Sequence, residues 1–315
     1  MKKVKEFFSI PKGCLLELIL MVILFGVNEV LAFTMPYYSV HKAYYDGGAY
    51  GVVLILVLLL CFLRLFLTKK KSAVDLGVIL FAFFLLWEVS YKAGLVKNDL
   101  LIPSPEGLFH VFVEKHEELI KDVKGSINLL FFGYLLAVVL GTLLGLTAGW
   151  FGRIREITLP ISNVITLIPP LMFSAYLIMI LPTFRAAAIA VIFFAVFWPT
   201  FQGTVTGVGR IDRKVIEAAR TMGVSNVGML FKVIFPYCLP DIITSVSRSL
   251  RGAFMCLAGA EMLGMNLGIG YFVEKYKSLA DYRCVLAGIV TVGIITTLAD
   301  LLVGKLRAVL IRWKD

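Results

Sequence analysis

Charged residues are scarce in this sequence. Only 17% of its 315 residues are Asp, Glu, Lys or Arg, whereas 59% are hydrophobic. Soluble globular domains usually contain about 25% charged and about 45–50% apolar residues. Several apolar stretches also reach the roughly 20 residues that a helix needs to cross a bilayer. The composition therefore excludes a water-soluble domain and predicts an all-α, polytopic membrane protein.

Residues that bind metals or build disulfide frameworks are few as well. The five cysteines include no CxxC pair, and the three histidines show no ligand spacing such as HExxH. A phosphate-binding GxxxxGK(S/T) sequence is also absent. The sequence therefore predicts no catalytic residue, no metal site and no cofactor in this chain. Any ATP hydrolysis would belong to a separate polypeptide.

Eight apolar segments are long enough to be membrane spans. They comprise approximately residues 15–34, 49–68, 73–93, 128–150, 160–182, 186–205, 241–263 and 284–304. If the N-terminus is inside, 19 of the 31 Lys and Arg residues fall in the inner segments and 10 in the outer ones. Cytoplasmic loops are enriched in Lys and Arg. We therefore expect both termini to be cytoplasmic, and this clustering between spans argues against nucleic-acid binding.

The segment 94–127 is polar and interrupts the alternation of spans and short loops. Two prolines in Leu101–Pro105 predict an extended entry, and Ser104 is a suitable N-cap. A short amphipathic helix is expected to follow at the outer membrane surface.

Three glycines recur every fourth residue in the fourth span, at Gly141, Gly145 and Gly149. This spacing allows a neighbouring helix to approach closely, and it predicts packing inside the bundle.

The segment 206–240 is a second long interruption. Arg213–Met222 has the apolar spacing of a helix, and Gly223 can adopt the left-handed conformation that ends one. Ser225 can cap a second short helix, which is expected to stop at Pro236. The segment is thus predicted to form a cytoplasmic helix-turn-helix, whose apolar faces pack under the bundle or fit into a partner.

This loop resembles the signature of binding-protein-dependent ABC importer permeases, which reads EAA, three residues, Gly, nine residues and Ile-x-Leu-Pro. The matching residues here are Glu217, Ala218, Ala219, Gly223, Val233, Phe235 and Pro236. Val233 and Phe235 replace the usual Ile and Leu and keep the positions apolar.

Further motifs resemble the sulfonate, taurine and nitrate permeases. They are Trp87-Glu88, Leu101–Pro105, the span 126–149, Ile168-Pro169-Pro170, Ala260–Leu263 and Gly268–Tyr271. Leu129 stands where the branch usually has Arg. The resemblance covers about residues 73–310, so we expect a permease domain over 73–315 and an additional two-helix membrane segment over 1–72.

The resemblance implies an importer subunit in the bacterial inner membrane that forms the path for a small polar or anionic solute by alternating access. The expected partners are a cytoplasmic ATPase subunit that holds ATP and Mg²⁺, a second permease and an extracytoplasmic substrate-binding protein. Glu217, Ala218, Ala219, Gly223 and Pro236 would belong to the loop that docks on the ATPase.

Polar or helix-breaking residues inside spans are candidates for the solute path, because buried charges and broken helix ladders are costly in a bilayer. These candidates are Glu261, Gln202, Pro169 and Pro170, with Arg185 near the end of the sixth span. Each could instead cap a helix, snorkel or produce a simple kink.

Three other functions are weighed against the importer permease. The membrane subunit of a vitamin-type energy-coupling importer would carry Ala-x-Arg repeats, and this chain has the EAA…G pattern instead. A membrane-embedded enzyme would need a catalytic cluster of His, Asp or Glu at the end of a span. A stand-alone secondary transporter would show inverted repeats. No such cluster or repeat is recognisable.

Overall fold

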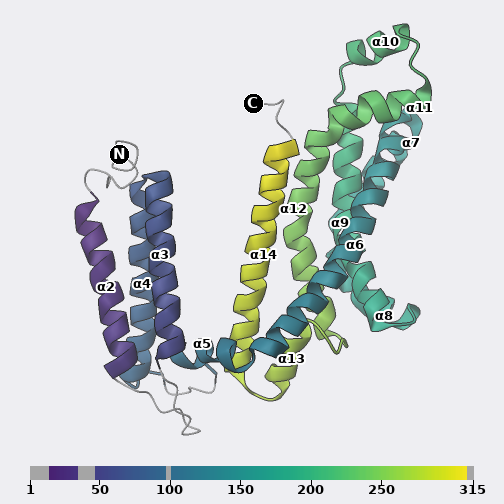
Figure 1. Cartoon of the computed structure of the whole chain (residues 1–315). Helices are drawn as coiled ribbons and strands as arrows, with labels where there is room; N and C mark the ends of the chain where they lie inside the picture. Colours follow the sequence, from purple (N-terminus) through teal and green to yellow (C-terminus); the bar gives the residue numbers. More distant parts are fainter. Residues whose placement is uncertain (1–13, 35–46, 97–100, 311–315) are drawn as a thin grey trace. The chain divides into compact units, whose positions relative to one another are not determined.

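The structure is a computed structural model that describes residues 14–34, 47–96 and 101–310, with side chains described up to residue 305. Every regular element in these ranges is helical, which confirms the predicted all-α class (Figure 1). The elements are α2 (Leu15–Thr34), α3 (Gly48–Thr68), α4 (Lys71–Lys92), α5 (Pro105–Glu114), α6 (His116–Trp150), α7 (Gly152–Thr166), the 3₁₀ helix η1 (Pro170–Phe173), α8 (Ser174–Ile180), α9 (Phe184–Gly209), α10 (Arg213–Thr221), α11 (Asn226–Gly228), the π-helix η2 (Met229–Ile234), α12 (Phe235–Met262), α13 (Ile269–Ser278) and α14 (Tyr282–Leu310).

Seven helices within these ranges are long and apolar enough to cross a membrane, and an eighth crossing is possible if α7 and the η1–α8 segment form one span. Those two segments meet at an angle of 85°. The predicted span at 160–182 is therefore not one straight helix. Pro169 and Pro170 lie at this bend. Proline has no backbone N–H to donate, so α7 cannot continue through them.

Packing divides the chain into two compact units. One contains the described residues up to Glu118 together with Lys275–Ala287, and the other contains Leu119–Glu274 together with the described residues from Gly288 onward. In the first unit α4 groups with α2 and α3. The resemblance predicts a different boundary, at residue 72, between an N-terminal addition and the permease domain. That boundary stays a prediction.

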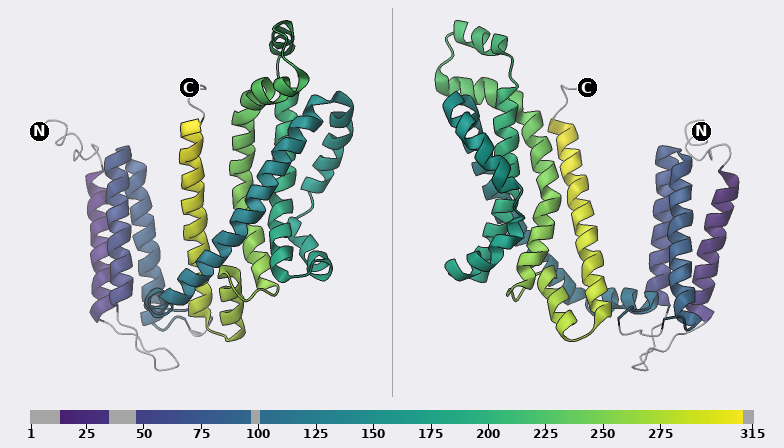
Figure 2. Two further views of the ribbon diagram at one scale, coloured as in Figure 1. Left: turned by 45° about the vertical axis from the view of Figure 1, so that its right-hand side comes forward. Right: turned by 180° about the vertical axis from the view of Figure 1, so that it is seen from behind.

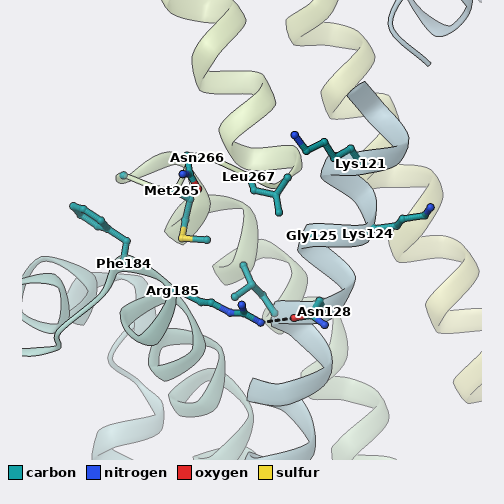
Figure 3. Close-up of a pocket in the computed structure, with 11 residues that line it drawn as sticks. Lys121, Lys124, Gly125, Asn128, Phe184, Arg185, Met265, Asn266 and Leu267 are labelled. Atoms are coloured by element: carbon teal, nitrogen blue, oxygen red, sulfur yellow. Dashed lines mark hydrogen bonds between the residues drawn. The ribbon is translucent and has the colours of Figure 1, made fainter. Parts of the chain in front are cut away.

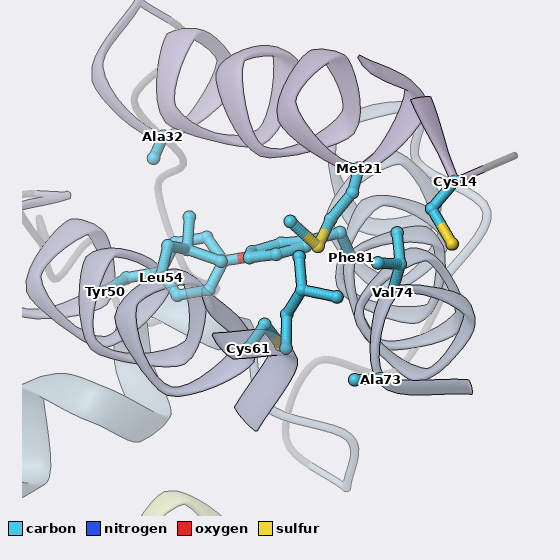
Figure 4. Packing of buried hydrophobic residues seen from close by; sticks show 10 residues of the cluster. Cys14, Met21, Ala32, Tyr50, Leu54, Cys61, Ala73, Val74 and Phe81 are labelled. Atoms are coloured by element: carbon cyan, nitrogen blue, oxygen red, sulfur yellow. The ribbon is translucent and has the colours of Figure 1, made fainter. Parts of the chain in front are cut away.

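In the first unit, α2, α3 and α4 form a bundle around a shared apolar core. Met21 of α2, Leu54 of α3 and Phe81 of α4 are all buried in it (Figure 4). Their outward faces carry many exposed leucine, isoleucine and valine side chains, as expected for helices that lie in lipid.

A buried ionic cluster lies at the end of this bundle. The Lys92 ammonium lies 2.5 Å from a Glu88 carboxylate oxygen and 3.4 Å from a Glu106 oxygen, and it also donates to the Leu31 carbonyl. Glu88 is fully buried, and the side chains of Lys92 and Glu106 are nearly so. This cluster joins residues of α2, α4 and α5.

The short helix predicted after Leu101–Pro105 is present as α5. The Ser104 hydroxyl accepts a hydrogen bond from the Gly107 N–H at 3.1 Å, and Pro105 occupies the first turn. The predicted cap is confirmed, because serine satisfies an N–H that has no partner within the helix.

In the second unit, α6 packs closely along α9 through its glycines. A Cβ added at Gly145 would lie 2.7 Å from Thr204 Cβ, and one at Gly149 would lie 2.7 Å from Val208 Cβ. At Gly141 an added Cβ would lie 3.1 Å from the Phe197 carbonyl oxygen. The predicted close approach is confirmed. The three glycines of α6 contact Thr200, Thr204 and Val208, which recur every fourth residue along one face of α9.

Candidate functional site

The first arm of the 206–240 loop is α10, which projects beyond the end of α9 (Figures 1 and 2). Its N-cap is Asp212, whose carboxylate accepts a hydrogen bond from the Lys214 N–H at 3.0 Å. Glu217 and Ala218 are exposed, whereas Ala219 is buried in a core that it shares with α9 and α12. The arm therefore has one alanine packed under the bundle, and its acidic residue is exposed.

The turn at Gly223 closes α10 with a Schellman motif. Gly223 has a φ of +74°. Its N–H donates to the Arg220 carbonyl at 2.9 Å, and the Val224 N–H donates to the Ala219 carbonyl at 3.2 Å. The predicted left-handed glycine is confirmed, since a residue with a side chain would be strained at this φ.

The second arm begins where predicted but does not end at Pro236. Ser225 accepts a hydrogen bond from the Gly228 N–H at 3.2 Å, and the chain then continues through α11 and η2 into α12. The expected stop is wrong because the wide π turn immediately before Pro236 has already shifted the hydrogen-bond register that a proline would interrupt. The arm and the span therefore form one continuous helix from Asn226 to Met262.

The loop is also tied to the end of α6. The Arg220 guanidinium lies 5.9 Å from the centre of the Trp150 ring, over its face. Met222 and Val227, on either side of the turn, are 77% and 66% exposed. The loop thus presents a stiff, partly apolar surface with Glu217 beside it.

Glu261, a predicted path residue, lies in a buried hydrogen-bond network. Its carboxylate accepts hydrogen bonds from the Ser126 hydroxyl at 2.7 Å and the Gly270 N–H at 2.8 Å. The Ser126 hydroxyl accepts from the Ile269 N–H at 2.9 Å, and Asp122 accepts from the Gly268 N–H at 3.0 Å. These side chains satisfy the N–H groups at the start of α13 and fasten it to α6 and α12.

The other predicted path residues lie outside this network, with Gln202 on α9 and Pro169 and Pro170 at the bend between α7 and α8. Gln202 of α9 donates a hydrogen bond to Asn163 of α7. Pro170 lines a cavity of about 100 Å³ with Phe173, Trp198 and other apolar residues. A role in the solute path stays a prediction for Glu261, Gln202, Pro169 and Pro170.

A larger pocket, of about 760 Å³, is shown in Figure 3. It is lined by residues at the start of α9, whereas the 206–240 loop begins at the end of that helix. Its cations are Lys121 and Lys124 of α6 and Arg185 of α9, and Arg185 donates to Asn128 at 2.6 Å. None of its lining residues is acidic. Sequence reasoning singled out Arg185 and missed both lysines, although their three-residue spacing on a helix was a usable signal.

Comparisons with known proteins agree with these features. Residues 137–309, more than half of the chain, match the family described as binding-protein-dependent transport system inner membrane component. The chain belongs to this family. The family match favours the binding-protein-dependent importer over the energy-coupling importer and the membrane enzyme considered above.

Three relatives illustrate the similarity. The permease SsuC of Bacillus subtilis (strain 168), named for aliphatic sulfonates transport, is 28% identical over 73% of this chain and 84% of its own length. The nitrate import permease protein NrtB of Leptolyngbya laminosa is 32% identical over 58% of this chain and 66% of its own. The taurine transport system permease protein TauC of Escherichia coli (strain K12) is 27% identical over 70% and 78%.

The chain is thus a multi-pass inner-membrane permease subunit of an ATP-binding-cassette importer, and it is not an enzyme. Subunits of this family work with an ATPase that is a separate chain and with a substrate-binding protein. Within the described residues, no group of three or more His, Cys, Asp or Glu side chains could hold a metal ion.

Proposed function

We propose that this permease forms part of the path for a small polar or anionic solute and that its 206–240 loop receives the movement of a separate ATPase. The observation that carries the proposal is the continuous helix from Asn226, capped by Ser225, to the end of α12. A stiff connection of this kind can pass a displacement at the loop directly to a membrane span, whereas a flexible loop would absorb it.

The surface of the loop supports ATPase docking. Glu217 and Ala218 are exposed on α10, and Met222 beside the turn is largely exposed. An exposed carboxylate can accept a charge-assisted hydrogen bond from a basic group, and the small Ala218 allows close approach. Gly223 sets the angle between the arms, and the buried Ala219 anchors α10 to the bundle. ATP and Mg²⁺ would be held by the partner chain.

The other proposed partners follow from the family and from the exposed apolar surface. A second permease, identical or not, would complete the path, and an extracytoplasmic binding protein would deliver the solute. The exposed apolar side chains of α8, with Met179 at 84% and Ile180 at 75%, require either lipid or a second permease as cover. The relatives are named for sulfonates, nitrate and taurine, and this supports a small polar or anionic solute.

Gly223→Pro is expected to abolish retention of the ATPase subunit when the complex is purified in mild detergent. Proline fixes φ near −65° and removes the N–H that bonds to the Arg220 carbonyl, so the turn at φ +74° cannot form. The measurement is the ratio of ATPase to permease in the purified complex.

A matched control is Gly94→Pro. Gly94 also has a positive φ, of +70°, and its N–H donates to the Tyr91 carbonyl at 2.9 Å, as the Gly223 N–H does to Arg220. Gly94 lies outside the loop, so this variant should keep the ATPase. Equal retention by Gly223→Pro and the unsubstituted chain would refute the docking role.

Both termini are proposed to be cytoplasmic, because the inner segments carry most of the Lys and Arg residues. A C-terminal alkaline phosphatase fusion should therefore be inactive, while a C-terminal green fluorescent protein fusion should fluoresce. Phosphatase inserted after Gly94 should be active, since this position follows the third predicted span. The reverse pattern would overturn the orientation.

A further inference from the structure

One face of α12 is polar in the first half of the predicted span 241–263. Ser247, Arg248 and Arg251 follow Thr244 at offsets of three, four and seven residues, so the four lie on one side of the helix. Together with Asp300 and Gly304 of α14 they line a cavity of about 380 Å³. All six residues belong to the second unit.

A neighbouring face of α12 is apolar and buried. Leu250, Phe254 and Leu257 pack in the core that α12 shares with α6 and α9. In contrast, the Arg251 side chain is 71% exposed, and an added Cβ at Gly252 would have no atom within 4 Å. The polar face is thus open in a single subunit.

This face cannot lie against lipid without a substantial cost. Both helices satisfy the length and apolarity of a membrane span, and the predicted spans 241–263 and 284–304 include Arg248, Arg251 and Asp300. Placing one arginine at the centre of a membrane helix costs about 2.5–3.5 kcal/mol on insertion scales. Charged residues within spans therefore face water-filled cavities or protein, and they often mark the route of a solute.

The charges on this face leave one cation in excess. Arg251 Nη2 donates to Asp300 Oδ2 at 2.7 Å, so these two charges offset each other. Arg248 makes no hydrogen bond or ion pair in the described part of the chain. Next to it are the Thr244 and Ser247 hydroxyls, which donate to the carbonyls of Pro240 and Ile243 and keep lone pairs free.

We propose that Arg248 and Arg251 bind the negatively charged group of the transported solute on this open face of α12. The guanidinium of arginine matches the planar or tetrahedral oxygen arrangement of small oxyanions and can bind two oxygens at once. Asp300 holds Arg251 in place and limits the net positive charge, so an anion can bind and still leave. The proposal rests on the proposed function, because it assigns a site within the same solute path.

The test uses a cysteine at Ser247 in the purified complex with its ATPase in lipid nanodiscs. Ser247→Cys changes an oxygen to a sulfur beside Arg248 with little change in volume. Two thiol reagents of similar size are compared, an anionic sulfonatoethyl and a cationic trimethylammonioethyl methanethiosulfonate. Each rate is divided by the rate of the same reagent with free 2-mercaptoethanol.

The anionic reagent is expected to react at least about tenfold faster than the cationic one, because a cation in a confined cleft raises the local concentration of anions. The ratio of rates also cancels any change in thiolate fraction caused by the arginines, since that change speeds both reagents equally. Methanesulfonate in excess should slow the anionic reagent. The five native cysteines are buried, so the chain without Ser247→Cys gives the background.

Substitutions at Arg248 test whether its charge causes the preference for the anionic reagent. Arg248→Gln should remove the preference, and Arg248→Lys should retain most of it. Arg153→Gln removes the same charge from an exposed position on α7, outside this cavity, and should leave the preference unchanged.

Two results would overturn the proposal. Equal normalised rates for the two reagents would show that the face does not select anions. Failure of both reagents would show that lipid or a second permease covers it. Retention of the ATPase in the same sample separates these results from failure of the proposed function, which would appear as loss of the ATPase itself.

Discussion

Lys92→Met is expected to unfold the bundle of α2, α3 and α4, at a cost of about 3–5 kcal/mol. Lys92 lies between two buried carboxylates, at 2.5 Å from Glu88 and 3.4 Å from Glu106. Methionine has a similar length but no charge, so two carboxylates would face each other with little access to water. Removing one partner of a buried ion pair is costly for this reason.

The effect can be measured as the apparent melting temperature of the purified chain in detergent. Lys71→Met is the matched control, because Lys71 pairs with Glu17 at 2.6 Å but the two side chains are 56% and 26% exposed. An exposed pair contributes about 0–1 kcal/mol. Adding Glu88→Gln and Glu106→Gln to Lys92→Met should recover part of the stability. Equal losses for Lys92→Met and Lys71→Met would contradict the buried cluster.

The apolar core of the first unit links α4 to the two additional N-terminal helices. Phe81 and Val74 of α4 are buried against α2 and α3 in the core of the first unit. The resemblance assigns α4 to the permease and the two preceding helices to an addition, yet α4 depends on them for cover. Deleting residues 1–70 would therefore expose the inner face of α4, the helix that the resemblance assigns to the permease.

Features that depend on a few neighbouring residues were predictable from the sequence. Ser104 and Ser225 cap the helices that follow them, and Gly223 has the expected positive φ. In each case the signal and the structure lie within about four residues, so local chemistry decides the outcome. The apolar spans were predictable for a similar reason, because their length is set by the bilayer.

Unlike the glycine contacts of α6, several other features that depend on packing were not predictable. Pro236 signalled a helix end, but a π turn before it lets the helix continue into α12. Pro169 and Pro170 signalled a break, but no sequence pattern predicts its angle of 85°.

Ion pairs between distant helices were missed for the same reason. Arg251 and Asp300 are 49 residues apart, and their pairing requires α12 and α14 to be placed side by side. Sequence patterns therefore do not predict which residues on different helices come together in a site.

Gly145→Leu is expected to separate α6 from α9 and to destabilise the second unit by on the order of 3 kcal/mol. A Cβ at Gly145 alone would lie 2.7 Å from Thr204 Cβ and 3.0 Å from the Phe201 carbonyl oxygen. The backbone of α9 cannot yield locally, because Gly141 and Gly149 hold the same helix close one turn away on either side. A leucine would push all three contacts apart, and membrane helices depend on such contacts because lipid is as apolar as the side chains.

Gly293→Leu is the matched control, since an added Cβ at Gly293 would meet no atom within 4 Å. Both changes replace a helical glycine by leucine, so the gain in helix propensity is the same and only the packing differs. Thermal denaturation of the two variants in the same detergent should show a large loss for Gly145→Leu and little or none for Gly293→Leu. If Gly145→Leu melted at the temperature of the unsubstituted chain, α6 and α9 could not be in the contact that positions the 206–240 loop under the bundle.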